Sequence, residues 1–282
     1  MTDYRMRIAF NGQAYAGWQR QPGQNTVQQC VEEVLRSVFQ EKDLTVTASG
    51  RTDAGVHALD MALSFRTAKT LPEEELVRLL KLRLPHDIRL REIVPSPGFN
   101  AHADALGKAY VYLIRPGEPD IFLKGLCWNW PGTEVNDELR RAVPRLVGTH
   151  DFRFFTGRRA DNGTVRTIFR AELLWFGPLL CFYISGSGFL HKMVRRLAGF
   201  LYETALGRCT ADDLTRQLEN PQSPPDDFTV APPDGLYLQR VFYRPGEWRE
   251  DRLTGLPFLL PEPPQSAGTA SRLIPIFFQR RT

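Results

Sequence analysis

The chain has 282 residues, of which 42% are hydrophobic and 24% are charged, a balance typical of a soluble protein with one large or two ordinary domains. The four cysteines, at positions 30, 127, 181 and 209, form no Cys-x-x-Cys pair and the histidines do not cluster, so neither a zinc site nor a disulfide framework is expected. The chain opens with a charged strand and has no apolar run of membrane-spanning length, so we expect a cytoplasmic protein that is neither secreted nor inserted into a membrane.

Basic residues are concentrated in one part of the chain. The net charge of +4 permits nucleic-acid binding without establishing it. Between Asp151 and Thr210 there are nine Lys or Arg and four Asp or Glu. Most of the excess comes from Arg158, Arg159, Arg166, Arg170, Lys192, Arg195 and Arg196. A solvated face is the usual explanation of such a run, but its overlap with a candidate site motif favours contact with phosphates.

The first hundred residues alternate between strand and helix patterns. Strands are expected over residues 4–10, 44–48, 61–65 and 88–94, and helices from about Thr26 and from Pro72. Thr26 and Gln29 match a capping box, and the second helix carries three glutamates in its first turn, where acidic side chains complement the helix dipole. The order strand, helix, strand, strand, helix, strand predicts a ferredoxin-like unit, to which we assign residues 1–105.

The second half roughly repeats this pattern. Strands are expected over residues 108–114, 165–175 and 179–187, and helices from about Asn136 and from Phe189. In the last helix His191 and Arg195 fall four residues apart, away from the apolar stripe that begins at Phe189. These patterns predict a second α/β unit over residues 106–248. From residue 249 to residue 282 the pattern stops, and five prolines predict a tail that is extended, disordered or docked.

The most distinctive segment is Gly50-Arg51-Thr52-Asp53-Ala54-Gly55-Val56-His57-Ala58. It lies between two strand patterns and is therefore predicted to be a loop. Its two glycines permit a sharp bend and a close approach to a ligand, and loops on a rigid sheet are where catalytic groups concentrate. A plain turn, in which Thr52 and Asp53 bond the local backbone, explains these nine residues equally well.

The segment resembles the active-site motif of the TruA-type tRNA pseudouridine synthases, and further matches follow in order over roughly residues 4 to 243. The other specific match is Gly188-Phe189-Leu190-His191-Lys192-Met193-Val194-Arg195. The supporting matches are FNGQAYAGWQRQ at 10–21, FNA at 99–101, KAYVY at 108–112, GTHDF at 148–152, VRTI at 165–168 and APPDGLYL at 231–238.

This resemblance implies a fold and an activity. The expected fold is α/β (α+β), with two ferredoxin-like or RRM-like units whose antiparallel sheets join across a central cleft. The expected activity is that of an isomerase that converts uridine to pseudouridine in the anticodon stem-loop of tRNA, at positions 38 to 40. The resemblance also implies that tRNA is the partner, that the protein is a homodimer, and that the reaction uses no metal and no small-molecule cofactor.

By the same resemblance, Asp53 is the catalytic carboxylate, ionised at neutral pH as an ordinary aspartate is. Arg195 is its expected partner, because a buried carboxylate needs a fixed cation to stay charged. From the residues alone, phosphate contact or solvation is the preferred explanation of Arg195. Tyr110 is expected to stack on the target uracil, although core packing is the ordinary role of a strand tyrosine.

The remaining site residues surround this set. Arg51 and Lys192 are expected to contact the RNA, whereas His57 is expected either to contact it or to order the loop. Gly50, Thr52 and Gly55 are expected to shape the loop. Trp18 and Gln19 are interpreted as structural residues in preference to RNA contacts.

Two positions depart from the family pattern. After His57-Ala58 the family has the pattern x-Gly-Gln, where x is any residue, whereas this chain has Leu59-Asp60-Met61. At the second position, His102 stands where the family has Arg. Both departures bear on RNA affinity, and they make a catalytically silent RNA-binding or tRNA-folding protein the alternative hypothesis. An aspartate-dependent phosphoryl or glycosyl transferase is a third one, but it needs a metal-binding acid cluster or a second catalytic carboxylate, for which Asp60 is a poor candidate.

Overall fold

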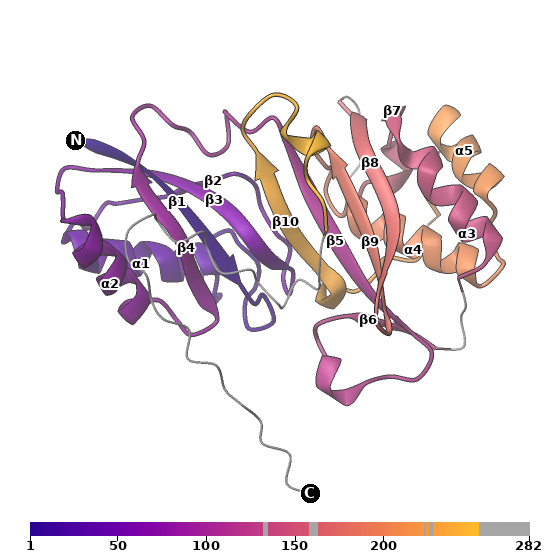
Figure 1. Ribbon diagram of the computed structural model, residues 1–282, viewed down its shortest axis with the longest axis horizontal. Coiled ribbons are helices and arrows are strands. Elements are labelled where there is room, and N and C mark those ends of the chain that lie inside the picture. Colours follow the sequence, from indigo (N-terminus) through magenta and orange to yellow (C-terminus); the bar gives the residue numbers. More distant parts are fainter. Residues whose placement is uncertain (132–134, 158–162, 223, 226–227, 254–282) are drawn as a thin grey trace, which may run out of the picture.

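The computed structural model describes residues 1–131, 135–157, 163–222, 224–225 and 228–253. In this part of the chain ten strands form one sheet, along which the order is β4-β1-β3-β10-β5-β9-β8-β7, with β2 beside β3 and β6 beside β5 (Figure 1). The strands are β1 (Thr2–Phe10), β2 (Thr47–Ala48), β3 (His57–Thr67), β4 (Ile88–Pro95), β5 (Gly107–Pro116), β6 (Trp128–Trp130), β7 (Gly148–Asp151), β8 (Val165–Phe176), β9 (Leu179–Gly186) and β10 (Leu236–Phe242). The helices are α1 (Val27–Phe39), α2 (Glu73–Arg83), α3 (Asp137–Ala142), α4 (Met193–Ala205) and α5 (Ala211–Glu219).

The first half of the chain has the predicted ferredoxin-like strand order, β4-β1-β3 with β2 at the side of β3, and its ladders are antiparallel. Helices α1 and α2 begin where Thr26 and Pro72 predicted. The capping box is only half formed, because Thr26 accepts a hydrogen bond from the backbone of Gln29, whereas the Gln29 side chain donates to Glu33. The strand predicted over 44–48 is reduced to Thr47–Ala48, and the next strand begins at His57, earlier than predicted.

The second half has antiparallel strands β5, β9, β8 and β7, and β5, β8, β9 and the helix start at Asn136 match the prediction. The prediction of a helix from Phe189 is wrong, because α4 begins at Met193. Lys192 has a φ of 59°, in the left-handed region, so the apolar spacing that starts at Phe189 does not lie on one continuous helix. Helix α5 and strands β6, β7 and β10 were not predicted.

Strand β10 joins the two halves. It pairs in parallel with β3 at Tyr237–His57 and Leu238–Ala58, and antiparallel with β5 over most of its length. Because β1 covers the other edge of β3, β2 and β10 share one edge of β3, and the sheet forks between them. The predicted fold class, two α/β units whose sheets join, is confirmed; the boundary at residue 105 stays a prediction.

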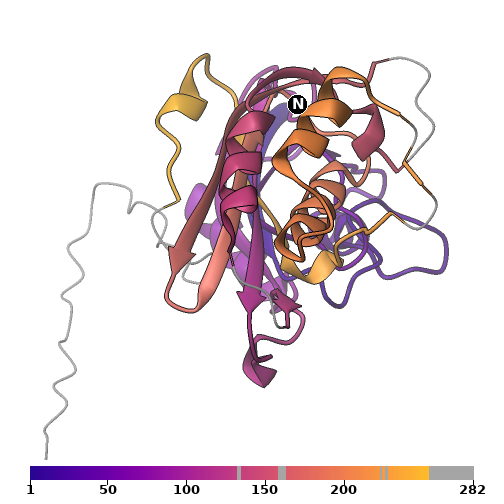
Figure 2. The same cartoon turned by 90° about the vertical axis from the view of Figure 1, so that its right-hand side faces the viewer.

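Side chains alternate along β5 between two apolar layers. Tyr112 and Ile114 belong to the core beneath α3, α4 and α5, whereas Val111 and Leu113 belong to a layer on the opposite face. Figure 2 shows the sheet from one side, with the orange helices on one face and the yellow segment after β10 on the other. That segment packs on the sheet through Trp248, which stacks on Phe169 at 4.2 Å between ring centroids. Of the predicted tail, 249–282, residues 254–282 lie outside the described residues.

Other features of the described residues bear on class. None of the helices in the described ranges is long and apolar enough to span a membrane. Within the same ranges, no group of three or more His, Cys, Asp or Glu side chains is arranged to hold a metal ion. The four cysteines carry free thiols.

Candidate active site

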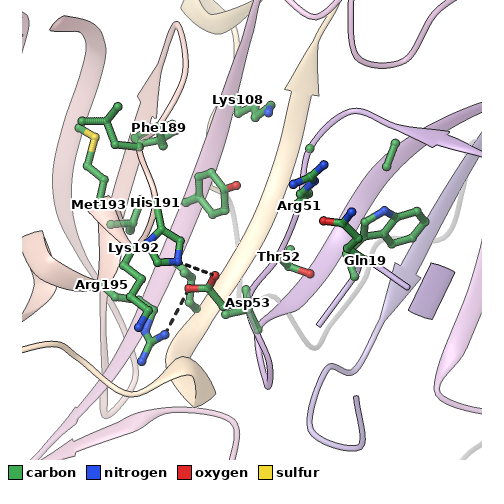
Figure 3. A pocket seen from close by; sticks show the side chains of 18 of the residues that line it. Gln19, Arg51, Thr52, Asp53, Lys108, Phe189, His191, Lys192, Met193 and Arg195 are labelled. Atoms are coloured by element: carbon green, nitrogen blue, oxygen red, sulfur yellow. Dashed lines mark hydrogen bonds and ion pairs between the residues drawn. The ribbon is translucent and has the colours of Figure 1, made fainter. Parts of the chain in front are cut away.

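A cavity of about 570 Å³ lies at the fork of the sheet. One wall comes from β2 and the loop that follows it, another from β5, and a third from the segment that leads into α4 (Figure 3). Both halves of the chain therefore build the cavity. Among the described residues that line it, Asp53 is the single carboxylate, and the cations of Arg51, Lys108, Lys192 and Arg195 line the same cavity.

The loop that carries Asp53 is held by its backbone. Gly55 has a φ of +79°, which favours glycine, and its amide donates to the carbonyl of Tyr15 at 3.2 Å. The carbonyl of Thr52 accepts a hydrogen bond from the amide of Trp18 at 3.1 Å. Trp18 itself is buried and packs in the core of the first half, as a structural residue would, although both Trp18 and Gln19 also line the cavity.

The Asp53 side chain points away from its own loop toward the other half of the chain. Its Oδ2 lies 3.3 Å from Nη1 of Arg195, and its Oδ1 lies 3.9 Å from Nε2 of His191 (Figure 3). This geometry is not that of a plain turn, in which the carboxylate bonds the local backbone. The expectation of a buried carboxylate is wrong, because the Asp53 side chain is 30% exposed while that of Arg195 is 14% exposed.

Arg195 is held independently of Asp53. Its Nε donates to the carbonyl of Ala231 at 2.7 Å, and its own carbonyl accepts from the amide of Ala231 at 3.1 Å. The guanidinium therefore bridges Ala231, in the segment that leads to β10, and the carboxylate of the first half. An arginine can do this because its planar fork presents several donors in fixed directions.

The segment around Ala231 also contacts the Asp53 loop. A side chain at Gly55 would lie 2.9 Å from Cγ of Pro233, and the carbonyl of Pro232 accepts the hydroxyl of Tyr112 at 2.6 Å. Residues 231–235 thus fix the distance between the loop and β5. This close packing is a physical reason for a glycine at position 55.

Tyr110 forms part of the wall on β5. Its ring meets Phe189 edge to face, with centroids 5.1 Å apart, and burial together with the nearby negative charge of Asp53 raises the pKa of its phenol. A phenol kept neutral presents a ring face and a hydroxyl, which suits a stacking surface for a base. Tyr110 is only partly buried and lines the cavity, so it is not a core side chain alone.

The cations of the lining come from three segments. Arg51 and Lys192 are exposed and line the cavity, and their contact with RNA stays a prediction. Lys192 has its left-handed backbone conformation immediately before α4, so its side chain is not part of the helix. Lys108 and His191 were not predicted as site residues, although both stand inside the motifs given above. In the strand that carries Lys108, the alternating pattern indicated only that Tyr110 and Tyr112 share a face.

The prediction that His57 contacts substrate is corrected by its burial. The side chain is 1% exposed and does not line the cavity. Its Nδ1 accepts a hydrogen bond from the amide of Gly12 at 3.0 Å, so Nε2 carries the proton and faces the carbonyls of Gly125 and Asp234. Burial lowers the pKa of His57, which agrees with a neutral ring. The alternative, a role in ordering the loop, is the one that the contacts support.

Gly50 and the two departures also find physical explanations. Gly50 leaves room for the end of the Lys108 side chain, because a side-chain carbon there would lie 2.6 Å from Nζ of Lys108. Asp60 forms a bidentate ion pair with Arg7 outside the cavity, and Met61 is buried in the core of the first half. His102 is exposed and lines the cavity. Of the two departures, only His102 lines this cavity.

The comparisons with known proteins agree with this geometry. A family model described as tRNA pseudouridine synthase matches residues 6–104 and 142–244. Curated relatives called tRNA pseudouridine synthase A include those of Geobacillus sp. (strain WCH70), 36% identical over 84% of this chain and 96% of the relative, and of Akkermansia muciniphila, 38% identical over 86% and 96%. The relative from Geobacter sp. (strain M21) is 37% identical over 86% of this chain and 99% of its own length.

Solved structures show a weaker likeness. The match to the crystal structure of the archaeal box H/ACA sRNP Nop10-Cbf5 complex covers 71% of this chain and 43% of the chain in that structure. Its TM-score is 0.34 and the sequence identity is 12%. This likeness is too slight to support an argument about the site. The family model matches the loop of Asp53 and the segment of Arg195, and the curated relatives cover more than four fifths of the chain. The chain belongs to the tRNA pseudouridine synthase family.

Proposed function

We propose that the protein isomerises uridine to pseudouridine in the anticodon stem-loop of tRNA, at positions 38 to 40, and that Asp53 is its catalytic carboxylate. One observation carries the proposal: among the described residues, the cavity is lined by a single carboxylate, partly exposed, which is oriented by an arginine from the other half of the chain. The tRNA specificity is supported by the family membership of the chain.

The reaction needs no more than this set. The bond from C1′ of the ribose to N1 of uracil breaks, the base turns, and a bond from C1′ to C5 forms, after which C5 loses its proton and N1 gains one. Asp53 serves this exchange as the nucleophile or as the base that takes the proton. Arg195 holds the carboxylate in position, because its guanidinium donates to Oδ2 of Asp53 from a fixed place beside the cavity.

The other lining residues supply the substrate contacts. A uridine must leave its stack to reach Asp53, and the partly buried ring of Tyr110 offers the surface on which it stacks. Arg51 and Lys192 are exposed cations that contact the RNA backbone. Thr52, Gly50 and Gly55 shape the loop through the backbone contacts and the close packing described above. A cytoplasmic homodimer that works without a cofactor remains part of this proposal.

The catalytically silent RNA-binding protein is the second candidate. The departure at His102 favours it, since a histidine there lines the cavity in place of the family arginine. The intact pairing of Asp53 with Arg195 beside Tyr110 argues for activity. A transferase with two carboxylates is disfavoured, because Asp60 is engaged by Arg7 outside the cavity.

Release of tritium from a tRNA transcript labelled at C5 of uracil tests the proposal. The wild-type protein is expected to release tritium without added metal, and Asp53→Asn is expected to release none while binding the transcript within several-fold of wild type. Asp43→Asn, an exposed aspartate outside the cavity, is the matched control and should keep full activity. Turnover by Asp53→Asn would remove the catalytic assignment. Tight binding of several transcripts by wild type without release would establish the silent protein instead.

A further inference from the structure

Lys108 is a cation that the proposed reaction leaves without a role. It stands on β5 two residues before Tyr110, so the two side chains leave the strand on the same face and both line the cavity. Figure 3 shows the Lys108 side chain running from β5 toward the side of the cavity that carries Arg51, away from Arg195. The ammonium therefore lies beside the expected position of the base and apart from Asp53.

The surroundings of Lys108 do not neutralise it. The side chain is partly buried, and no hydrogen bond or ion pair joins its ammonium to another of the residues that the structure describes. Burial without a compensating carboxylate lowers the pKa of Lys108. Removing an ammonium from water without a partner is unfavourable, so the unliganded protein keeps this charge at a cost in stability.

Gly50 preserves the position of this ammonium. A side-chain carbon at Gly50 would lie 2.6 Å from Nζ of Lys108, closer than any real contact, and 3.5 Å from Cε. Gly50 has no unusual backbone angle, and a side-chain carbon there meets only the end of the Lys108 side chain, so a larger residue would displace the ammonium and leave the backbone as it is. The loop of Asp53 and the strand of Tyr110 are thus packed against each other through an unpaired cation.

We propose that Lys108 binds a backbone phosphate next to the target uridine and that Gly50 makes room for it to do so. This inference rests on the proposed function, since the ligand is the tRNA. A phosphate is the group that an unpaired ammonium beside a base-stacking ring is suited to bind, because RNA carries one beside every base. The phosphate supplies the negative charge that Lys108 lacks in the unliganded protein. Arg195 does not need such a partner, because it already contacts Asp53.

The salt dependence of tRNA binding tests the phosphate contact. The full-length Lys108→Met variant, which keeps most of the stem, is compared with wild type and with Lys81→Met, an exposed lysine on α2. At low salt, binding of an unmodified transcript by Lys108→Met is expected to weaken roughly tenfold. The slope of log Kd against log salt should fall by about 0.7 to 0.9, the contribution of one phosphate. An unchanged slope in Lys108→Met would overturn the proposal.

A double-mutant cycle tests the part assigned to Gly50. Gly50→Ala displaces the ammonium and should weaken binding as Lys108→Ala does, while in the Lys108→Ala background the added methyl group has nothing to displace. The two changes should therefore be strongly non-additive. Full additivity would mean that Gly50 acts through something other than Lys108, and this part of the proposal would be withdrawn.

The turnover assay separates this inference from the proposed function. In Lys108→Met the KM for tRNA should rise about as much as Kd, with kcat within roughly threefold of wild type, because a phosphate contact acts in the bound and the transition state alike. A large loss of kcat with unchanged KM would contradict the assignment. If wild type binds tRNA but releases no tritium, the proposed function fails while the salt slopes still decide the role of Lys108.

Discussion

The pairing of Asp53 with Arg195 serves orientation more than stability. The carboxylate is 30% exposed, and the two atoms in contact are 3.3 Å apart. Ion pairs that remain in contact with water contribute only about 0 to 1 kcal/mol to folding. Arg195 keeps its hydrogen bonds to Ala231 whether or not the carboxylate is present. Asp53→Asn should therefore remove the charge without unfolding the protein, which makes it a clean test of chemistry.

His57 predicts a pH dependence of folding. Its pKa is lowered by burial from an ordinary value of 6.5. As the pH falls below about 6.5 the unfolded chain takes up a proton on this imidazole, whereas the folded protein does so only at a lower pH. The unfolded state then binds more protons, so the free energy of unfolding decreases. This contribution is fully present above about pH 6.5 and is lost as the pH falls toward the pKa of the folded state.

His57→Gln should remove this dependence and lower stability at neutral pH. The amide of Gly12 loses its buried acceptor, at a cost of about 1 to 3 kcal/mol. Melting curves between about pH 7.5 and pH 5.5 should show a smaller fall in Tm for His57→Gln than for wild type. His86→Gln, an exposed histidine outside the cavity, is the control and should follow wild type. Parallel curves for wild type and His57→Gln would show that His57 does not titrate differently in the folded state.

Helix α4 depends on one glycine for its approach to the segment before β10. A side-chain carbon at Gly199 would overlap the carbonyl of Thr229. Alanine is ordinarily better than glycine inside a helix by about 1 kcal/mol. At Gly199 an alanine is expected to destabilise the protein instead, because the helix must move away from residues 229–231, where Ala231 is hydrogen-bonded to Arg195. Overpacking of this kind costs roughly 1 to 3 kcal/mol.

Gly199→Ala should therefore lower both stability and turnover. The displaced helix carries Arg195 away from Asp53, so we expect kcat for tritium release to fall by tenfold or more, as an order of magnitude. Gly188→Ala is the matched control, because a carbon there meets only the side chain of Arg166 at 3.7 Å. A Gly199→Ala protein as stable and as active as wild type would show that a methyl group fits between α4 and the carbonyl of Thr229, against this prediction.

Elements with their own local signals could be predicted from the sequence. Helix α1 has an apolar stripe and a capping threonine, and its start at Thr26 was predicted correctly. The start of α4 could not be read from periodicity, because the left-handed turn at Lys192 interrupts a spacing that looks continuous. Strand β10 depends on partners at His57 and Tyr112, which are far away in the sequence. The pairing of Asp53 with Arg195 came from the family resemblance, and the contact of Lys108 with Gly50 needed the fold.

At the scale of the whole molecule, the cavity exists because the sheet forks. β2 and β10 share one edge of β3, and the space between them is lined by Thr47, Lys108 and Leu236 among others. The carboxylate comes from the first half and its guanidinium from the second, so neither half holds a complete site. The face of β5 that carries Tyr110 faces this cavity, and the opposite face carries the apolar layer beneath the segment after β10.

The segment from 246 to 253 should therefore contribute to stability and not to chemistry. It lies beyond the residues matched by the family model, which end at 244. Trp248 stacks on Phe169. Glu247 accepts a hydrogen bond from Arg240 at 2.8 Å, and Asp251 accepts one from the buried hydroxyl of Tyr183 at 2.5 Å. A chain that ends at Pro245 exposes these groups and leaves the Tyr183 hydroxyl without its acceptor. Burial of one large side chain and one lost buried hydrogen bond together suggest a cost of about 3 to 5 kcal/mol.

Chains that end at residue 245 and at residue 253 should thus differ in Tm and not in kcat. The longer one keeps every contact described above, and the shorter one should melt about 6 to 20 °C lower. At temperatures where both are folded, tritium release per folded molecule should agree within roughly twofold, because the lost segment lies on the face of the sheet opposite the cavity. If the shorter chain is well folded by circular dichroism yet inactive, then the packing of Trp248 and Asp251 reaches through β5 to Tyr110, and the two faces of the sheet are coupled.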